Sequence, residues 1–128
     1  MIVVDASVIL EILLNSRVAP GIALRISANS LHAPHVLDLE VTHALRRLVR
    51  TAQLGDTRGE QALADLMELR VTRYPHTPFL PRIWGLRNNL SAYDASYVAL
   101  AESLDAVLLT RDAFLASAPG HEAQIELL

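Results

Sequence analysis

The sequence contains neither cysteine nor lysine, and these two absences exclude several kinds of chemistry. With 0 Cys, the chain has no disulfide framework, no zinc–thiolate site and no cysteine nucleophile. All 11 basic residues are arginine, so the P-loop, which requires Gly-Lys-Ser/Thr, is excluded. Any mechanism built on a lysine is excluded in the same way.

Long apolar runs are also missing. The N-terminal run from Met1 to Leu14 is interrupted by Asp5 and Glu11 and has no basic segment in front of it. It therefore predicts neither a signal peptide nor a transmembrane helix, and we expect a cytoplasmic protein. A length of 128 residues with 52% hydrophobic residues predicts a single folded domain over residues 1–128.

Short apolar segments alternate with helical segments along the chain. Strands are expected over residues 2–4, 31–33, 71–74, 106–109 and 125–128, and helices over 6–14, 18–28, 36–52, 57–70, 83–86 and 94–104. Thr57 and Glu60 fit a capping box at the start of the fourth helix. Strands without polar alternation, separated by helices, indicate a parallel sheet covered on both faces. The predicted fold class is therefore a three-layer α/β/α domain with a central parallel sheet.

Four acidic residues beside apolar runs are the main functional candidates. They are Asp5 in Val-Val-Asp-Ala-Ser, Glu40 in Asp-Leu-Glu-Val, Asp94 in Ala-Tyr-Asp-Ala and Asp112 in Leu-Thr-Arg-Asp. Asp5 and Asp112 follow expected strands, and ligands of parallel sheets bind beyond the carboxyl ends of the strands. Carboxylates that gather there repel each other unless a divalent cation neutralises them. Such a cluster commonly holds Mg²⁺ or Mn²⁺ against a phosphodiester, so the pattern predicts a metal-dependent nuclease.

Two of the four acids have a simple structural alternative at the start of a helix. Asp5 is placed to cap the helix that begins at Ala6, which is a common role for an aspartate after a strand. Asp112 is placed to cap a short helix from Ala113. Capping and metal binding are compatible roles for one carboxylate.

The other two acids lie inside helices. Glu40 lies at the margin of an apolar helix face, where an ion pair with Arg47 or His43 is the structural alternative. Asp94 falls within the apolar face of its helix, where capping with Ser91 or the helix dipole is the alternative. If all four acids had only structural roles, their meeting at one edge of the sheet would be an accident.

The remaining polar residues give weaker signals. The five histidines show no metal-ligand spacing and are expected at the surface or in polar networks. The hydroxyls of Ser7 and Thr110 lie two residues from Asp5 and Asp112, where they can orient a carboxylate or a metal-bound water, although capping explains Ser7 equally well.

The net charge of −3 does not exclude RNA, because the four candidate acids together carry more negative charge than the whole chain does. The candidates for phosphate contacts are Arg46, Arg47, Arg50, Arg87 and Arg111, for most of which a solvated helix face is the alternative.

The four acidic motifs, in this order along essentially the whole chain, resemble the PIN-domain ribonucleases, and within them the VapC toxins of bacterial type II toxin–antitoxin pairs. Ala-Tyr-Asp-Ala-Ser-Tyr-Val-Ala-Leu-Ala and Leu-Leu-Thr-Arg-Asp are specific in combination, whereas Asp-Ala-Ser alone is weak. The resemblance implies a PIN fold and an endoribonuclease with Mg²⁺ or Mn²⁺ held by Asp5, Glu40, Asp94 and Asp112, of which Asp5 and Asp94 are the direct ligands. It also implies an RNA substrate, a homodimer and inhibition by a VapB-type antitoxin.

Two other functions compete with this interpretation. A phosphotransfer domain of haloacid-dehalogenase or receiver type also places an aspartate after a strand, but both types use a lysine, and the first needs a second aspartate where Ser7 stands. A catalytically silent PIN module for RNA binding or regulation is the remaining alternative. The four intact acids argue against it.

Overall fold

A parallel five-stranded sheet forms the centre of the computed structural model, which describes residues 1–15 and 17–128. The strand order is β3-β2-β1-β4-β5, and every neighbouring pair is parallel. The strands are β1 (Ile2–Val4), β2 (Leu31–Pro34), β3 (Val71–Tyr74), β4 (Val107–Thr110) and β5 (Ile125–Leu127). The prediction of a parallel sheet is confirmed.

The central strand is buried on both faces. Val3 and Val4 both have no exposed surface. Successive side chains of a strand point to opposite faces of the sheet, so these two residues report on one face each. Both faces of the sheet must therefore be covered, as the lack of polar alternation in residues 2–4 predicted.

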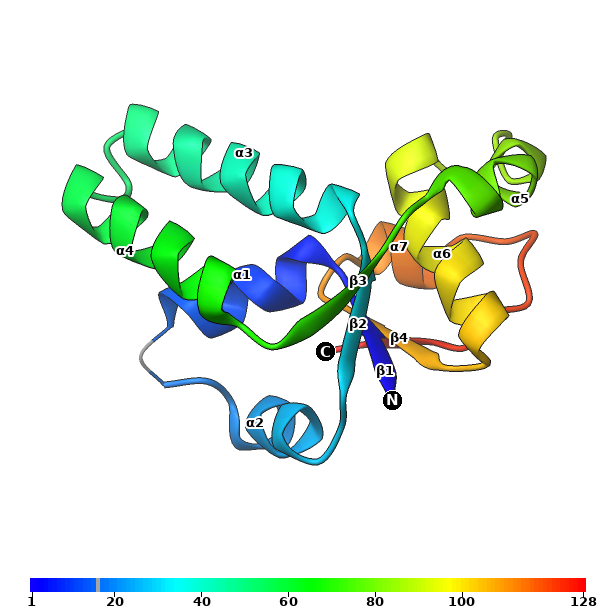
Figure 1. The fold of residues 1–128 in the computed structure, drawn as a ribbon, viewed down its shortest axis with the longest axis horizontal. Coiled ribbons are helices and arrows are strands. Elements are labelled where there is room, and N and C mark those ends of the chain that lie inside the picture. The colour runs from blue at the N-terminus through cyan, green and yellow to red at the C-terminus, as the bar shows by residue number, and fades with distance from the viewer. Residues whose placement is uncertain (16) are drawn as a thin grey trace.

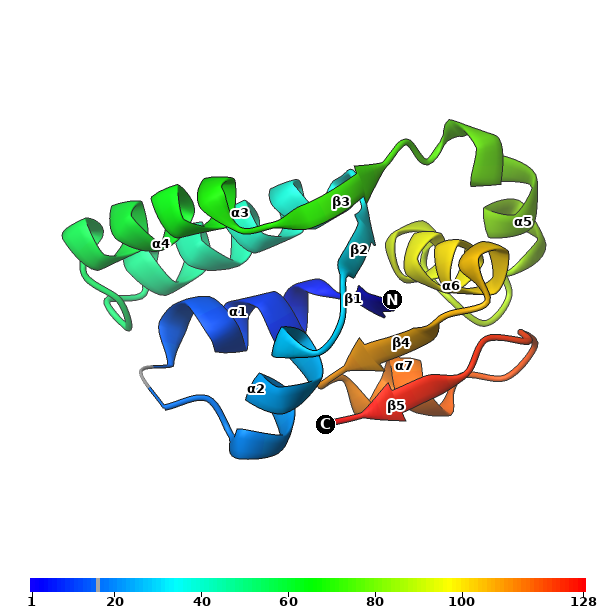
Figure 2. The same ribbon diagram turned by 60° about the horizontal axis from the view of Figure 1, so that its bottom comes forward.

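Helices form the two outer layers. Within the described residues these are α1 (Ala6–Leu14), α2 (Pro20–Ser27), α3 (Val36–Arg50), α4 (Asp56–Glu68), α5 (Leu80–Gly85), α6 (Ala92–Leu104) and α7 (Ala113–Ser117). Helices α1, α3 and α4 lie on one side of the sheet, and α5 and α6 lie on the other (Figure 1, Figure 2). This arrangement confirms the three-layer α/β/α prediction. In the part of the chain that is described, no helix has the length and apolar character needed to cross a membrane.

Helices α3 and α4 form an antiparallel pair that extends away from the sheet (Figure 1). Gly59 of α4 permits their close approach, because a Cβ at this position would lie 2.8 Å from a methyl carbon of Val49. The capping box predicted at Thr57 is wrong. The chain is already helical at Asp56, after Gly55 in an extended conformation and without a side-chain cap, so Thr57 lies inside the first turn.

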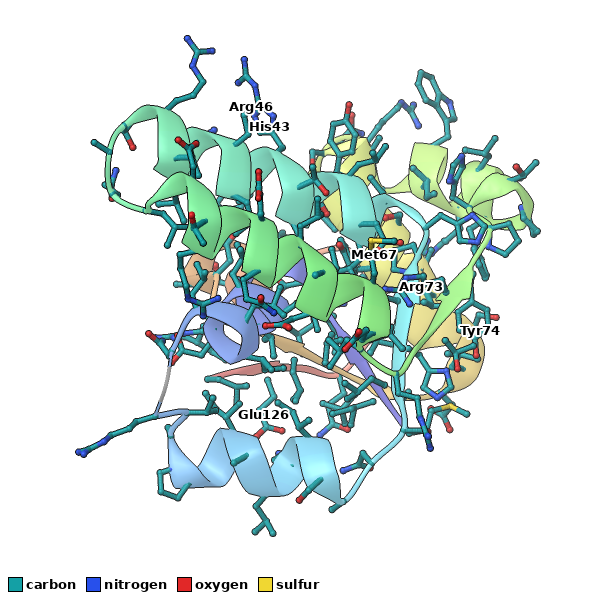
Figure 3. The ribbon with its side chains drawn as sticks, turned by 60° about the vertical axis from the view of Figure 1, so that its left-hand side comes forward. His43, Arg46, Met67, Arg73, Tyr74 and Glu126 are labelled. Carbon is teal, nitrogen blue, oxygen red and sulfur yellow. The ribbon has the colours of Figure 1, made fainter. Side chains whose placement is uncertain are left out.

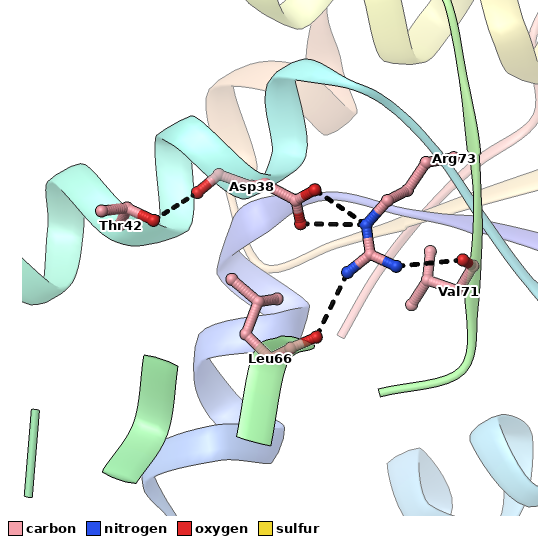
Figure 4. A network of polar contacts seen from close by, with 5 residues as sticks. All are labelled: Asp38, Thr42, Leu66, Val71 and Arg73. Carbon is pink, nitrogen blue, oxygen red and sulfur yellow. Dashed lines mark hydrogen bonds and ion pairs between the residues drawn. The ribbon is translucent and has the colours of Figure 1, made fainter. Parts of the chain in front are cut away.

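One arginine joins three elements beneath this helix pair (Figure 4). The Arg73 Nε donates to both carboxylate oxygens of Asp38 on α3, at 3.0 and 2.8 Å. Its two terminal nitrogens donate to the carbonyl oxygens of Val71 and Leu66, at 3.1 and 3.2 Å. Arg73 thereby ties β3 to α3 and to the end of α4. This contact fixes the base of α3, the helix that carries Glu40.

Candidate active site at the carboxyl edge of the sheet

The topology brings the four sequence-predicted acids to the same edge of the sheet. Asp5 directly follows β1. Asp112 lies two residues beyond β4, which pairs with β1 in parallel. Glu40 lies near the start of α3, which follows β2, and Asp94 lies in the first turn of α6. Strand ends and helix starts meet at the carboxyl edge of a parallel sheet, where ligands usually bind.

Asp5 is the most buried of the four, with 6% of its surface exposed. It caps α1 by accepting the backbone N–H of Val8 at 3.2 Å, as the structural alternative required. Its carboxylate also accepts the hydroxyl groups of Ser7 and Thr110, each at 2.5 Å. Burial raises the pKa of Asp5, and these hydrogen bonds to the charged form oppose the rise.

Glu40 faces α6 rather than the basic residues of its own helix. The Tyr97 hydroxyl donates to its carboxylate at 2.6 Å, so the ion pair with Arg47 or His43 that the structural alternative required is not formed. Burial raises the pKa of Glu40, the Tyr97 hydrogen bond opposes this, and the charges of Asp94 and Asp5 raise the pKa further. Burial and the charge of Glu40 also raise the pKa of Tyr97, so the phenol stays protonated and acts as a donor.

Tyr97 is a site residue that sequence reasoning assigned only to the apolar face of its helix. It is 1% exposed, and a buried tyrosine hydroxyl requires a polar partner. That requirement was the available signal, but the identity of the partner was not readable from the sequence.

Asp94 is half-buried at the start of α6. Its backbone N–H donates to the Ser91 hydroxyl at 3.1 Å, so Ser91 is the helix cap and Asp94 belongs to the first turn. Burial raises the pKa of Asp94, as do the charges of Asp112 and Asp5, while hydrogen bonding with Ser91 opposes the rise. The Ser91 cap therefore explains the start of the helix but leaves Asp94 close to the charges of Asp112 and Asp5.

Asp112 is exposed and caps α7. It accepts the Phe114 N–H at 2.9 Å, and its own N–H donates to the Thr110 hydroxyl oxygen at 2.9 Å. The capping alternative is thus realised at both Asp5 and Asp112.

The four carboxylates are coupled electrostatically, yet they do not form a closed cluster. Within residues 1–15 and 17–128, no three His, Asp or Glu side chains are arranged to enclose a metal ion. Asp5 is directed to two hydroxyls and Glu40 to a phenol. The assignment of all four acids as metal ligands therefore stays a prediction. The donors are carboxylate oxygens, and such hard ligands fit Mg²⁺ or Mn²⁺.

A groove of about 810 Å³ follows α3, and of the four acids Glu40 lines it. Its wall includes Glu40, Tyr93, His43, Arg46, Arg47, Leu39, Leu10, Ala6, Val36, Thr42 and Ala44. His43 and Arg46 project outward from α3 (Figure 3).

The other arginines considered for phosphate contacts differ in their surroundings. Arg111 pairs with Glu11, and the Arg87 guanidinium lies 4.7 Å from the centre of the Trp84 ring. Arg50 is exposed near the end of α3. Arg46 and Arg47 are thus the two candidates that line the groove.

Comparison with known proteins agrees with this architecture. Residues 2–120 match the family model of the PIN domain. The chain is 51% identical over 112 residues to the VapC ribonuclease Mb0985 of Mycobacterium bovis, covering 88% of this chain and 86% of that protein. It is 43% identical over 129 residues to ribonuclease VapC1 of Mycobacterium tuberculosis, covering 98% and 96%. The chain therefore belongs to the PIN-domain family and, within it, to the VapC proteins.

The fold also matches a solved toxin–antitoxin structure. VapBC2 from Rickettsia felis, bound to a DNA fragment from its promoter, superposes with a TM-score of 0.71 at 11% identity, covering 100% of this chain and 99% of that chain. At this identity the match concerns the fold alone.

Proposed function

We propose that this protein is the toxin of a type II toxin–antitoxin pair and a Mg²⁺- or Mn²⁺-dependent endoribonuclease that hydrolyses RNA phosphodiester bonds. The observation that carries the proposal is the convergence of Asp5, Glu40, Asp94 and Asp112 at the carboxyl edge of the parallel sheet, where neighbouring carboxylates raise the pKa of Glu40 and of Asp94. Like charges in partial burial cost free energy, and a bound cation offsets that cost. The ribonuclease names of the relatives support the same activity.

Asp5 and Asp94 would hold the cation directly, with Glu40 and Asp112 beside them. A divalent cation supplies a water of lowered pKa as nucleophile and neutralises the negative charge that develops on the phosphate. The chain's own residues orient the carboxylates: Tyr97 holds Glu40, and Ser7 and Thr110 hold Asp5. Arg46 and Arg47, along the groove, attract the RNA backbone towards the acids.

The proposed partner is a VapB-type antitoxin. Solved relatives of this fold include a toxin–antitoxin complex from Klebsiella pneumoniae. In this chain, Leu39 is 73% exposed beside Glu40 and lines the groove. An antitoxin segment with apolar side chains would cover Leu39, and a basic side chain next to them would neutralise the acids. We further propose that the protein is a homodimer, as the family resemblance implies.

The test of the activity is cleavage of RNA by the purified chain. We expect cleavage with Mg²⁺ or Mn²⁺, loss of cleavage with EDTA, and a decrease of about 10- to 100-fold for Glu40→Gln, the usual cost of losing a residue beside the direct ligands. Glu68→Gln, at the exposed end of α4, is the matched control and should cut like the wild type. Undiminished cleavage after chelation would refute the metal-dependent mechanism.

The same assay separates a nuclease from a catalytically silent module. A silent module would retain RNA in a binding assay but would leave it intact with either metal. Addition of the antitoxin should stop cleavage by the wild-type chain. Full activity in the purified toxin–antitoxin complex would rule out the proposed mode of inhibition.

A further inference from the structure

Two large aromatic side chains are exposed on the helices next to the candidate active site. Trp84 on α5 is 69% exposed, and Tyr93 in the first turn of α6 is 61% exposed. Tyr93 directly precedes Asp94 in the chain. Aromatic side chains of this size normally contribute to a core or to an interface. Their exposure beside a polar site therefore indicates a binding surface.

Tyr93 lies between two hollows of the surface. It lines the groove along α3 that also contains Glu40, and it lines a second cavity of about 200 Å³. The wall of this second cavity includes Leu80 and Ile83 of α5, and Ile83 is the chain neighbour of Trp84. The start of α6 lies between α5 and the start of α3 (Figure 1, Figure 2). The surface thus leads from Glu40 across Tyr93 to α5.

A positive charge is fixed over the ring of Trp84. The Arg87 guanidinium lies 4.7 Å from the ring centre, and its Nη1 donates to the Trp84 carbonyl oxygen at 3.0 Å. Among the residues that the structure describes, no carboxylate forms an ion pair with Arg87. The side chains of Trp84 and Arg87 therefore combine an exposed aromatic surface with an uncompensated positive charge.

This combination fits single-stranded RNA better than it fits a second copy of the chain. Proteins bind single-stranded nucleic acids through aromatic side chains on which bases stack and through cations that contact the phosphates. In a two-fold dimer built on this surface, the patch would meet itself. Two unpaired Arg87 charges would then share one largely apolar interface, which is unfavourable. A polyanion instead supplies the missing negative charge.

We propose that Tyr93, Trp84 and Arg87 form a binding surface for single-stranded RNA, in which bases stack on the two rings and a phosphate contacts Arg87. Bound RNA would pass Glu40 with Arg46 and Arg47 on one side and this surface on the other. The inference rests on the proposed function, because RNA is the proposed substrate. It adds substrate-binding residues at some distance from the groove along α3.

The test uses the fluorescence of Trp84, which is the only tryptophan of the chain. The full-length protein is titrated with a single-stranded RNA of about 12 nucleotides, within the usual range of site sizes, in EDTA so that the RNA stays intact. We expect the RNA to quench the fluorescence. Trp84→Ala and Tyr93→Ala should each raise the Kd by about 5- to 150-fold, the usual contribution of one stacked base, as measured by the anisotropy of labelled RNA.

The conservative and charge variants make the test specific. Trp84→Phe keeps a ring and should retain most of the affinity. Arg87→Gln should weaken binding and reduce the slope of log Kd against log salt by about 0.7, the value for one lost phosphate contact with a single strand. Leu24→Ala on α2, at a residue that is 68% exposed, and Arg70→Gln, which also removes an exposed positive charge, are the controls and should bind like the wild type.

A protein interface at the same surface would give a different result. If Trp84→Ala changes the oligomeric state in analytical ultracentrifugation while its affinity for RNA stays that of the wild type, the patch joins two copies and the proposal is overturned. In the cleavage assay, Trp84→Ala should raise KM more than it lowers kcat, because stacking holds the substrate and takes no part in the chemistry. A loss in kcat alone would contradict a binding role.

The outcomes also separate this inference from the proposed function. If the wild type cleaves RNA but both alanine variants bind RNA as tightly as the wild type does, only the stacking surface is refuted. If binding depends on Trp84 and Tyr93 as expected but no RNA is cleaved with Mg²⁺ or Mn²⁺, the surface stands and the nuclease function fails. If the wild type neither binds nor cleaves RNA, both proposals fail.

Discussion

The Tyr97 hydroxyl donates to the Glu40 carboxylate at 2.6 Å and thereby joins α6 to α3 across the candidate active site. The two residues are 57 positions apart in the chain. Tyr97 is buried and Glu40 is half-buried, so loss of the phenol leaves a partly desolvated carboxylate without its donor. The contact positions one of the four acids relative to a helix that carries another.

Tyr97→Phe should lower the free energy of unfolding by about 1–3 kcal/mol, the usual cost of leaving a buried polar group without its partner. It should also raise the pKa of Glu40 further, because the hydrogen bond that opposes the rise is removed. Urea denaturation measures the first effect, with Tyr93→Phe at an exposed position as control. Equal stability of the two variants would show that the hydrogen bond has little energetic weight.

Arg73→Met should destabilise the protein by about 2 kcal/mol, because it leaves Asp38 and two backbone carbonyls without their donor. The partial exposure of the ion pair, 25% for Arg73 and 40% for Asp38, keeps this figure well below that of a fully buried pair. Arg70→Met, at an exposed neighbouring position, should change stability little. Arg73→Lys should lie between the two, since lysine lacks the forked geometry. A loss for Arg73→Met no larger than for Arg70→Met would contradict the structural role.

His32 should make stability depend on pH. Its ring lies between the Ser30 and Tyr74 hydroxyls at 2.9 and 2.7 Å, and burial lowers its pKa below the ordinary value of 6.5. As pH falls below about 6.5, the unfolded chain takes up the proton first, so the contribution of His32 is present above this pH and is lost below it.

The difference in unfolding free energy between the wild type and His32→Gln should therefore shrink as pH falls from 7.5 to about 5. Using the difference removes the contribution of Asp5, Glu40 and Asp94, whose raised pKa values act in the opposite direction. His76→Gln, at an exposed histidine, is the control for the exchange of histidine for glutamine. A constant difference for His32→Gln would mean that its pKa is the same in the folded and unfolded states.

Local patterns were sufficient to predict the strands, most helices and the edge at which the acids lie. Asp5 was readable because it directly follows an apolar strand, and the capping role of Asp112 was readable because a short helix follows it. The partner of Glu40 was not readable, since Tyr97 reaches it through the packing of α6 against α3. The orientation of Ser7 depends in the same way on an amide 104 residues away. The start of α4 was misjudged because extended Gly55 lets the helix begin without the expected threonine cap.

The central proposal is that the carboxylates at the carboxyl edge of the sheet hold a divalent cation, and Asp94 is the residue best placed to test it. Burial and the charges of Asp112 and Asp5 raise its pKa, so its stabilising contribution is complete only below the ordinary pKa of about 3.9 and is lost as pH rises through the folded value. In the metal-free protein the charged form of Asp94 therefore costs free energy. Asp94→Asn removes that charge while preserving the shape of the side chain.

The most direct measurement is the melting temperature at pH 7 with and without Mg²⁺, for the wild type, Asp94→Asn and the exposed control Asp56→Asn. We predict that metal-free Asp94→Asn melts at the wild-type temperature or above it, and that Mg²⁺ raises the melting temperature of the wild type and the control but much less that of Asp94→Asn. An equal Mg²⁺-induced rise in all three proteins, or unfolding of Asp94→Asn, would contradict the account and leave Asp94 with a purely structural role.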